Sequence, residues 1–520
     1  MDPKNSNKEN RKDIKPEKED DEYSPLKPNN NEKIVSGVKK KLKLKDRLIL
    51  IKENTTVEPI MACYVMPSIL ASLAVQNLNL EKACRVNLNF TDEVCTALNL
   101  RQTENYTKEE EQVQKLIASI QVWKNIIQTA IPLFLILFVG AWSDKTGKRK
   151  ACILLPIVGE FLSCIGFIVN TFFMYELPAE VAALTESIFP AITGGWFTNF
   201  IGVFSYIGDI TTTENRTYRV GLVNMFMSLG YPIGSALSGV LLTWVGYYGV
   251  FLISSCLYLF SLIYGYFYLE EPKKKIPEKK KKAPKCLGFL REFFDIGLVL
   301  ETFKVAFKKG PGNRRLRVAL LLIVVCVVFG PLHGEFTILY LFSRYRFNWD
   351  EVQYSIWCTY AIVTNLIGTF FSISLFSNYM KLDDTILGII SNTSKIVAAF
   401  AYAFARNNLE IYLAPLLEIL NGTSFIAMRS IATKLVSGEE FGKVNSLFGL
   451  AEATMPLVYG PLYSRVYIAT LNILPGAVFL LGAMLTLPSI AIFGWLYFEH
   501  KKDITRNAEQ NLSSTEKQNP

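Results

Sequence analysis

Long apolar runs constrain the fold of this 520-residue chain more than any other feature. Stretches of about 20 residues, almost free of charged side chains, recur along it, and a bilayer core about 30 Å thick requires apolar helices of that length. Half of the residues are hydrophobic and 19% are charged, whereas soluble globular domains carry roughly 25% charged residues. The sequence therefore predicts a polytopic membrane protein and excludes a soluble enzyme.

We expect an all-α fold with twelve membrane-spanning helices. The runs are continuous and much longer than the roughly 10 residues of a transmembrane strand. Several contain proline or glycine, which membrane helices tolerate where neighbouring helices satisfy the backbone. The expected spans are residues 57–78, 119–141, 151–172, 183–211, 219–244, 247–269, 317–342, 352–376, 385–405, 409–433, 443–468 and 475–498.

Charged segments between these runs orient the chain. The segment after the sixth span is strongly basic and includes the runs Lys273–Lys275 and Lys279–Lys282. Because cytoplasmic loops are enriched in Lys and Arg, we place this segment and both termini in the cytoplasm, and the loop 79–118 outside. Basic residues that flank membrane spans indicate the lipid bilayer, and not nucleic acid, as their partner. The expected parts are a disordered cytoplasmic tail 1–56, a six-helix half 57–269, a basic cytoplasmic linker 270–316, a second six-helix half 317–498 and a cytoplasmic tail 499–520.

Two features of the 79–118 loop agree with an outer location. It contains Cys84 and Cys95, and disulfides persist in oxidising compartments. We expect these two cysteines to be bonded to each other; the alternative is free or separately paired thiols. The loop also contains the sequons Asn89-Phe-Thr and Asn105-Tyr-Thr, so Asn89 and Asn105 are expected glycosylation sites. The sequon at Asn511 falls in the predicted cytoplasmic tail and is expected to be a chance match.

A basic loop between the second and third expected spans carries the first family signal. It reads Gly140-Ala-Trp-Ser-Asp144-Lys-Thr-Gly147-Lys148-Arg149-Lys150 and resembles the G-x-x-x-D-x-x-G-[RK]-[RK] loop of the major facilitator superfamily. Gly140 allows two helices to approach closely and Gly147 permits a tight turn. Asp144 can cap a neighbouring helix or pair with a cation when the cytoplasmic side is shut. The resemblance implies two six-helix halves and a gating role for Gly140, Asp144, Gly147, Lys148 and Arg149.

Most of residues 56–498 is similar to a narrower group, the proton-coupled folate transporter group of solute carrier family 46. Blocks such as Thr56-Val-Glu58-Pro59, Asn348-Trp349-Asp350 and Pro475-Gly-Ala-Val-Phe-Leu-Leu-Gly482 carry this resemblance. It implies symport of protons with an organic anion, either folate-like or, as alternatives, a muropeptide, cyclic dinucleotide or steroid conjugate. Where the folate member of the family has a proton-coupling Glu, this chain has Asn224. Another carboxylate is therefore needed to carry the proton.

Ionisable side chains inside the expected spans are costly, so each is a candidate functional group. Glu452 is the first candidate for proton coupling because it lies mid-span in an apolar stretch; Asp209, Glu160 and Glu418 are the others. The alternative for each is a structural ion pair, and Lys395 is one conceivable partner.

Three residues are candidates for substrate binding. Arg429 matches a family arginine near the cavity, and a guanidinium suits a carboxylate or a phosphate. Tyr340 and Tyr231 have rings that could stack on a planar ligand; the alternative is packing against lipid or core.

No enzymatic signature competes with transport. The chain has two histidines and no P-loop motif, so neither a metal site, a His-based triad nor any cofactor is expected. We predict a secondary active transporter whose two halves give alternating access to a small anionic substrate and protons. A non-transporting receptor or scaffold on the same fold is the alternative. The expected location is the plasma membrane or an endosomal or lysosomal membrane.

Overall fold

The computed structural model describes residues 56–211, 213–271, 304, 307, 308, 310, 313–380, 382–435 and 438–516. All regular secondary structure among these residues is helical, in agreement with the predicted all-α fold. The predicted disordered tail and most of the predicted linker lie outside the described residues.

The helices of the first group occupy residues 58–268. Helix α2 begins with Pro59 in its first turn, where the missing N–H of proline removes no helical hydrogen bond. Helix α4 ends at Gly147, whose φ of 71° is left-handed and is easily adopted by glycine. The group comprises α2 (Glu58–Lys82), the short π-helix η2 (Ala83–Asn87), α3 (Asp92–Asn99), α4 (Thr107–Thr146), α5 (Arg149–Phe172), α6 (Ala179–Ile192), α7 (Gly195–Ile210) and α8 (Thr213–Tyr268).

The helices of the second group occupy residues 314–516. They are α11 (Arg314–Phe347), α12 (Glu351–Ser372), the π-helix η3 (Ile373–Tyr379), α13 (Asp384–Phe404), α14 (Asn408–Leu417), α15 (Thr423–Leu435), α16 (Gly438–Thr470) and α17 (Ala477–Glu516).

Each expected span coincides with a helix or with a pair of helices. The expected spans 183–211 and 409–433 are each broken into two helices, α6 with α7 and α14 with α15. Helix α8 contains two expected spans, separated at Gly246, where φ is 64°. Seven helices of the described part are long and apolar enough to cross a membrane. The total of twelve spans remains a prediction, because the broken and more polar helices do not meet that criterion.

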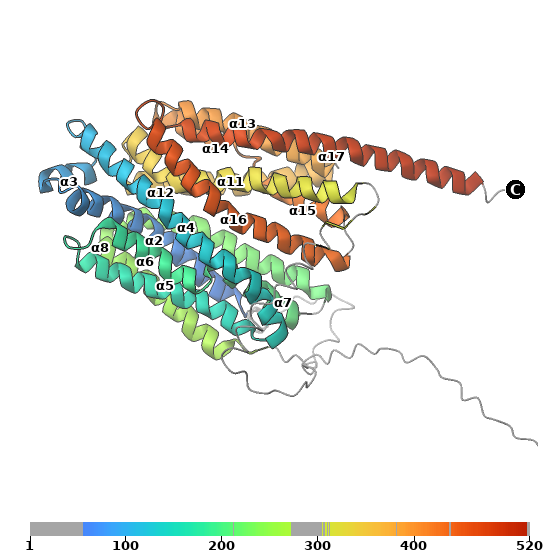
Figure 1. Ribbon diagram of the computed structural model, residues 1–520, viewed down its shortest axis with the longest axis horizontal. Helices are drawn as coiled ribbons and strands as arrows, with labels where there is room; N and C mark the ends of the chain where they lie inside the picture. Colours follow the sequence, from blue (N-terminus) through green and yellow to red (C-terminus); the bar gives the residue numbers. More distant parts are fainter. Residues whose placement is uncertain are drawn as a thin grey trace, which may run out of the picture. The chain divides into compact units, whose positions relative to one another are not determined.

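Helices of each group pack mainly against one another. In the first group α2 packs on α8, and α5 packs on α7 and α8; in the second, α11 packs on α16 and α17, and α13 packs on α17. Figure 1 shows this grouping, with the blue-to-green helices beside one another and the yellow-to-red helices beside one another. The two groups meet where α4 packs on α16 and α8 packs on α12. This packing suits the predicted pair of halves, whose boundaries remain a prediction.

Candidate functional site

A polar cavity of about 320 Å³ lies where the two groups meet. Helices α2, α4, α5, α6 and α7 line one side of it, and α11 and α16 line the other. Ligand sites of small molecules have volumes from roughly 300 Å³ upwards, so the cavity is large enough to be a candidate site. Its polar and ionisable lining residues are Ser72, Gln76, Gln121, Lys124, Asn125, Gln128, Thr129, Glu160, Glu186, His333 and Thr337.

Helix α4 contributes a polar stripe to this cavity. Gln121, Lys124, Asn125 and Gln128 are spaced by three or four residues, which places them on one face of a helix. All four line the cavity. Sequence reasoning missed this stripe because only one of its members is charged. The signal that reveals it is the helical spacing of polar residues inside the expected span 119–141.

One lysine and two carboxylates form the charged part of the cavity. Lys124 of α4 places its Nζ 2.7 Å from Oε1 of Glu186 on α6. The other oxygen of Glu186 is buried and has no hydrogen-bond partner among the residues that the structure describes. Glu160 of α5 lines the same cavity and makes no hydrogen bond or ion pair with any residue that the structure describes. With both carboxylates ionised, these three residues carry one net negative charge.

Small residues set the position of Glu160. At the preceding residue, Gly159, a Cβ would lie 2.8 Å from the carbonyl oxygen of Phe189, so α5 approaches the end of α6 closely. The chain then breaks at Gly194, which has a φ of 90° and would be strained with any other residue. The close approach brings Glu160 into the same cavity as Glu186, and the break starts α7, whose first residues also line the cavity.

The other predicted proton-coupling residues are held in ion pairs. Oε1 of Glu452 lies 2.9 Å from Nη2 of Arg429, and this pair stands one helical turn from Pro456, which lines the cavity. Asp209 pairs with Arg149 at 2.8 Å. Glu418 pairs with Lys395 at 2.9 Å, the partner that the sequence suggested. These contacts bring the predicted substrate arginine and the first predicted proton carrier together.

Neither predicted stacking tyrosine lines the cavity. Tyr340 is 1% exposed, and its hydroxyl donates a hydrogen bond to Asn77. Tyr231 of α8 is 36% exposed and is also absent from the cavity wall. Substrate stacking on these two rings remains a prediction that the cavity does not support.

The predicted gating loop has the expected turn. Gly147 is the left-handed residue that ends α4. Arg149 donates to Oδ2 of Asp209 and to Oγ of Ser143, so it ties the ends of α4, α5 and α7 together. Lys148 is exposed. The structure does not describe the surroundings of the Gly140 and Asp144 side-chain positions, so the gating roles remain predictions.

A cluster of buried charges lies beyond the cavity, toward the end of the bundle that carries the 79–118 loop, here called the disulfide end. Arg344 of α11 pairs with Glu110 of α4 at 3.3 Å, and its Nη2 donates to the carbonyl oxygen of Leu98 at 2.9 Å. Arg101 donates to Oε1 of Glu110 at 3.2 Å and to the carbonyl oxygen of Arg344 at 2.6 Å. We call Arg101, Glu110 and Arg344 the gate cluster. It joins the two helix groups beyond the cavity.

The gate cluster holds Glu110 in its ionised form. Burial would raise the pKa of Glu110, but Arg344 and then Arg101 outweigh it and hold the pKa below its ordinary value. Glu110 is 3% exposed and Arg344 is 2% exposed. Two buried guanidinium groups therefore share one carboxylate in place of water.

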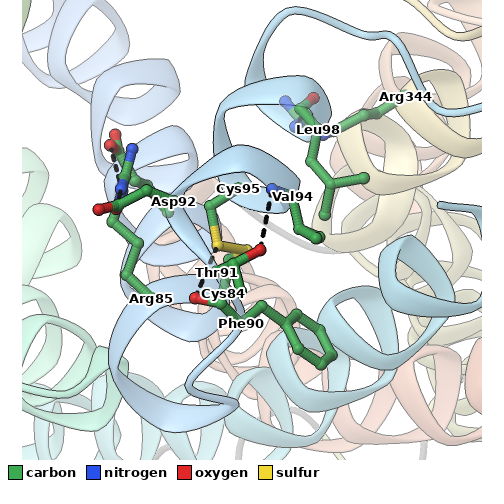
Figure 2. The surroundings of a disulfide bond; sticks show 10 residues. Cys84, Arg85, Phe90, Thr91, Asp92, Val94, Cys95, Leu98 and Arg344 are labelled. Atoms are coloured by element: carbon green, nitrogen blue, oxygen red, sulfur yellow. Dashed lines mark hydrogen bonds and ion pairs between the residues drawn. A yellow bond between two sulfur atoms is a disulfide. The ribbon is translucent and has the colours of Figure 1, made fainter.

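A disulfide between Cys84 and Cys95 confirms the predicted pairing. It joins η2 to α3 with a Cα–Cα distance of 5.8 Å. The side chain of Thr91 caps α3 by accepting from the amide of Val94. Figure 2 shows that the disulfide lies next to the turn of α3 that presents Leu98 to Arg344. The disulfide thus fixes the segment on which the gate cluster rests.

We expect glycans on Asn89 and Asn105, because both side chains are exposed at the disulfide end. Changing either residue to Gln should remove one glycan, seen as a gel-mobility step that glycosidase treatment also removes. Asn511→Gln is the matched control, because the predicted topology places that sequon in the cytoplasmic tail, where no glycan is added. A mobility change with Asn511→Gln, or none with the other two variants, would contradict the predicted orientation.

A helical membrane bundle with a polar, charged cavity between two helix groups is the arrangement expected of a secondary transporter. The family model of the Major Facilitator Superfamily matches residues 116–458. The chain belongs to this superfamily, and it is therefore an integral, multi-pass membrane transporter and not an enzyme.

Relatives within the superfamily confirm the resemblance to solute carrier family 46. The chain is 22% identical to a probable peptidoglycan muropeptide transporter of Drosophila melanogaster, over 86% of this chain and 86% of the relative. It is 24% identical to a lysosomal proton-coupled steroid conjugate and bile acid symporter of Gallus gallus, over 85% of this chain and 93% of the relative. Solute carrier family 46 member 2 of Canis lupus familiaris is 25% identical, over 74% of this chain and 82% of the relative.

Solved structures share the fold. The crystal structure of the human organic anion transporter MFSD10 aligns with a TM-score of 0.53 at 16% identity, over 84% of this chain and 98% of that one. A bacterial homologue of the human lysosomal transporter Spinster, in an inward-facing conformation, aligns with a TM-score of 0.52 at 13% identity. The alignment covers 84% of this chain and 98% of that one.

Proposed function

We propose that this transporter couples proton movement to the symport of an organic anion through the cavity, by alternating access of the two helix groups. The observation that carries the proposal is the arrangement of Lys124, Glu186 and Glu160 in a cavity beyond which the gate cluster joins the two helix groups. Lys124 attracts an anion, whereas Glu160, which has no partner among the described residues, repels it. Transport of the anion therefore requires a change of charge in the cavity.

Glu160 is the proposed proton carrier. When Glu160 is ionised, the cavity carries one net negative charge and repels an anionic substrate. When Glu160 takes up a proton, the remaining pair of Lys124 and Glu186 is neutral, and the lysine is free to share its donors with the substrate. Proton and anion thus bind together, which is the requirement for symport. Glu452, the first choice from the sequence, comes second because Arg429 already neutralises it.

The amides of the cavity favour a substrate with its own donors and acceptors. Each amide side chain offers hydrogen-bond donors and an acceptor, and the cavity contains Gln76, Gln121, Asn125 and Gln128. Folate-like compounds, muropeptides and cyclic dinucleotides can satisfy such groups, whereas the apolar body of a steroid conjugate would leave them unpaired at a cost. The relative from Drosophila melanogaster is named as a muropeptide transporter. We therefore place amide-rich or hydroxyl-rich anions ahead of steroid conjugates.

The disulfide end is proposed to face the acidic compartment. A disulfide and exposed sequons suit the outside of the cell or the lumen of an endosome or lysosome. The relative from Gallus gallus is named as lysosomal. Protons would then enter from the disulfide end and leave to the cytoplasm.

Uptake by purified protein in liposomes tests the proposal. An inward proton gradient is imposed, and a folate, a muropeptide, a cyclic dinucleotide and a steroid sulfate are supplied in turn. One coupled proton supplies about 1.4 kcal/mol per pH unit, enough for about tenfold accumulation. We expect accumulation that an ionophore abolishes. If the substrate only reaches equal concentrations inside and outside, with or without the gradient, the protein is a facilitative carrier and proton coupling is overturned.

A further inference from the structure

A second buried cluster of one lysine and two carboxylates lies in the second helix group. Lys395 of α13 places its Nζ 2.6 Å from Oε2 of Glu335 on α11 and 2.9 Å from Oε1 of Glu418 at the end of α14. Glu335 and Lys395 are 7% and 5% exposed. Glu335 lies only two residues from His333, but that spacing points the two side chains to different faces of α11, and only His333 lines the cavity.

The charges of this cluster do not balance. Fully ionised, it carries one net negative charge at a depth where uncompensated charge is costly. The titratable groups that face Glu335 add no second cation among the described residues, and α17 places Gly482 beside it. These groups are Lys395 and Tyr402 of α13, Glu418 of α14 and Tyr463 of α16.

Oε1 of Glu335 is the atom left without compensation. It is buried with no hydrogen-bond partner among the described residues, and the same is true of the hydroxyl of Tyr463. Both atoms lie within 3.0 Å of the point where a Cβ would stand on Gly482, so they face the same small space beside α17. A proton bound to Oε1 would neutralise the cluster and provide a donor for the Tyr463 oxygen.

The cluster is connected to the proposed site through a break in the helices. Glu418 ends α14, and Asn421, in the turn before α15, donates to the same carboxylate oxygen at 2.9 Å. Helix α15 carries Arg429, which pairs with Glu452 beside the cavity. The turn that contains Asn421 leads directly into α15. A change of charge at Glu418 therefore alters the contact of this turn, and with it the start of the helix that carries Arg429.

We propose that Glu335, sharing its proton with Glu418, is a second proton-coupling site of this transporter. The inference rests on the proposed function, to which it adds a site in the second helix group. A proton from the acidic side binds Oε1 of Glu335, forming an O–H bond, and the same proton is released when the site faces the opposite side. Because the two carboxylates share one lysine, the proton belongs to the pair.

The test measures proton binding with the proton alone as the probe. Wild-type proteoliposomes on a solid-supported membrane receive a jump from neutral to mildly acidic pH without substrate, and the transient charge displacement is recorded. Glu335→Gln and Glu418→Gln each remove the excess negative charge, so each is expected to lose half of the wild-type displacement. Glu160→Gln is expected to lose the other half, and Glu104→Gln, an exposed loop residue, is expected to lose none.

The outcomes separate this inference from the proposed function. A normal displacement in folded Glu335→Gln, together with a complete loss in Glu160→Gln, would overturn the second site and leave the proposed function intact. No displacement in the wild type would refute proton coupling itself. Failure of both Glu335→Gln and Glu418→Gln to give monodisperse protein would also count against the inference, because the cluster would then be a structural ion pair.

Discussion

Glu160→Gln is expected to remove the part of pH-driven substrate accumulation that one proton supplies, while leaving substrate exchange intact. Glutamine mimics the protonated carboxyl group, so the cavity of the variant accepts the anion at every pH but returns no proton. Accumulation should therefore fall about tenfold per pH unit of imposed gradient, which is the share that one coupled proton supplies. Counterflow of labelled substrate between equal internal and external pools should continue at the wild-type rate, because exchange needs no net proton movement.

The pH dependence of binding supplies the second readout for Glu160. Wild-type binding should strengthen as the pH falls, whereas binding by Glu160→Gln should be strong and independent of pH. Glu452→Gln is the informative comparison, because it removes the carboxylate that Arg429 already neutralises. If Glu452→Gln loses accumulation and Glu160→Gln keeps it, the carrier is Glu452, as the sequence alone suggested, and the cavity argument fails.

Glu110→Gln is expected to open the cavity at the disulfide end. The substitution leaves Arg101 and Arg344 buried without their common partner, and removal of one partner of a buried ion pair costs about 3–5 kcal/mol. Because the cluster joins the two helix groups in the closed state, that cost falls on the closed state, and the open population should rise by about two orders of magnitude or more. A membrane-impermeant maleimide added from the disulfide end should then label a cysteine placed at Gln76, which lines the cavity.

Glu111→Gln is the matched control for the gate. Glu111 is the next residue and also joins the helix groups, since it accepts a hydrogen bond from Asn472, but this contact is exposed. Exposed contacts contribute little, so labelling should stay at the wild-type rate. Equal labelling of Glu110→Gln and wild type would show that the gate cluster does not hold the cavity shut.

The sign of the pKa shift predicts how the gate responds to acid. A carboxylate whose folded pKa is depressed stabilises the closed state above its ordinary pKa, and that contribution is lost only as the pH falls through the depressed value. The gate should therefore stay closed at the mildly acidic pH of an endosome or lysosome. Labelling of the Gln76→Cys variant should remain slow across that range.

Local features of the chain were predictable from the sequence. The spans follow from runs of apolar residues, because the bilayer sets the required length and no distant contact is involved. The turn at Gly147 and the Cys84–Cys95 disulfide were also predictable, since each joins residues close together in one loop.

The pairing of buried charges was decided by the tertiary structure. Lys124 meets Glu186 across 62 positions of sequence, and Lys395 meets Glu335 across 60. Which carboxylate remains unpaired depends on which helix faces touch, and the identity of a residue does not specify its neighbour on another helix. The sequence could therefore name Glu452 first and Glu160 and Glu418 after it, but only the packing of the helices placed Glu452 against Arg429 and left Glu160 in the cavity without a partner among the described residues.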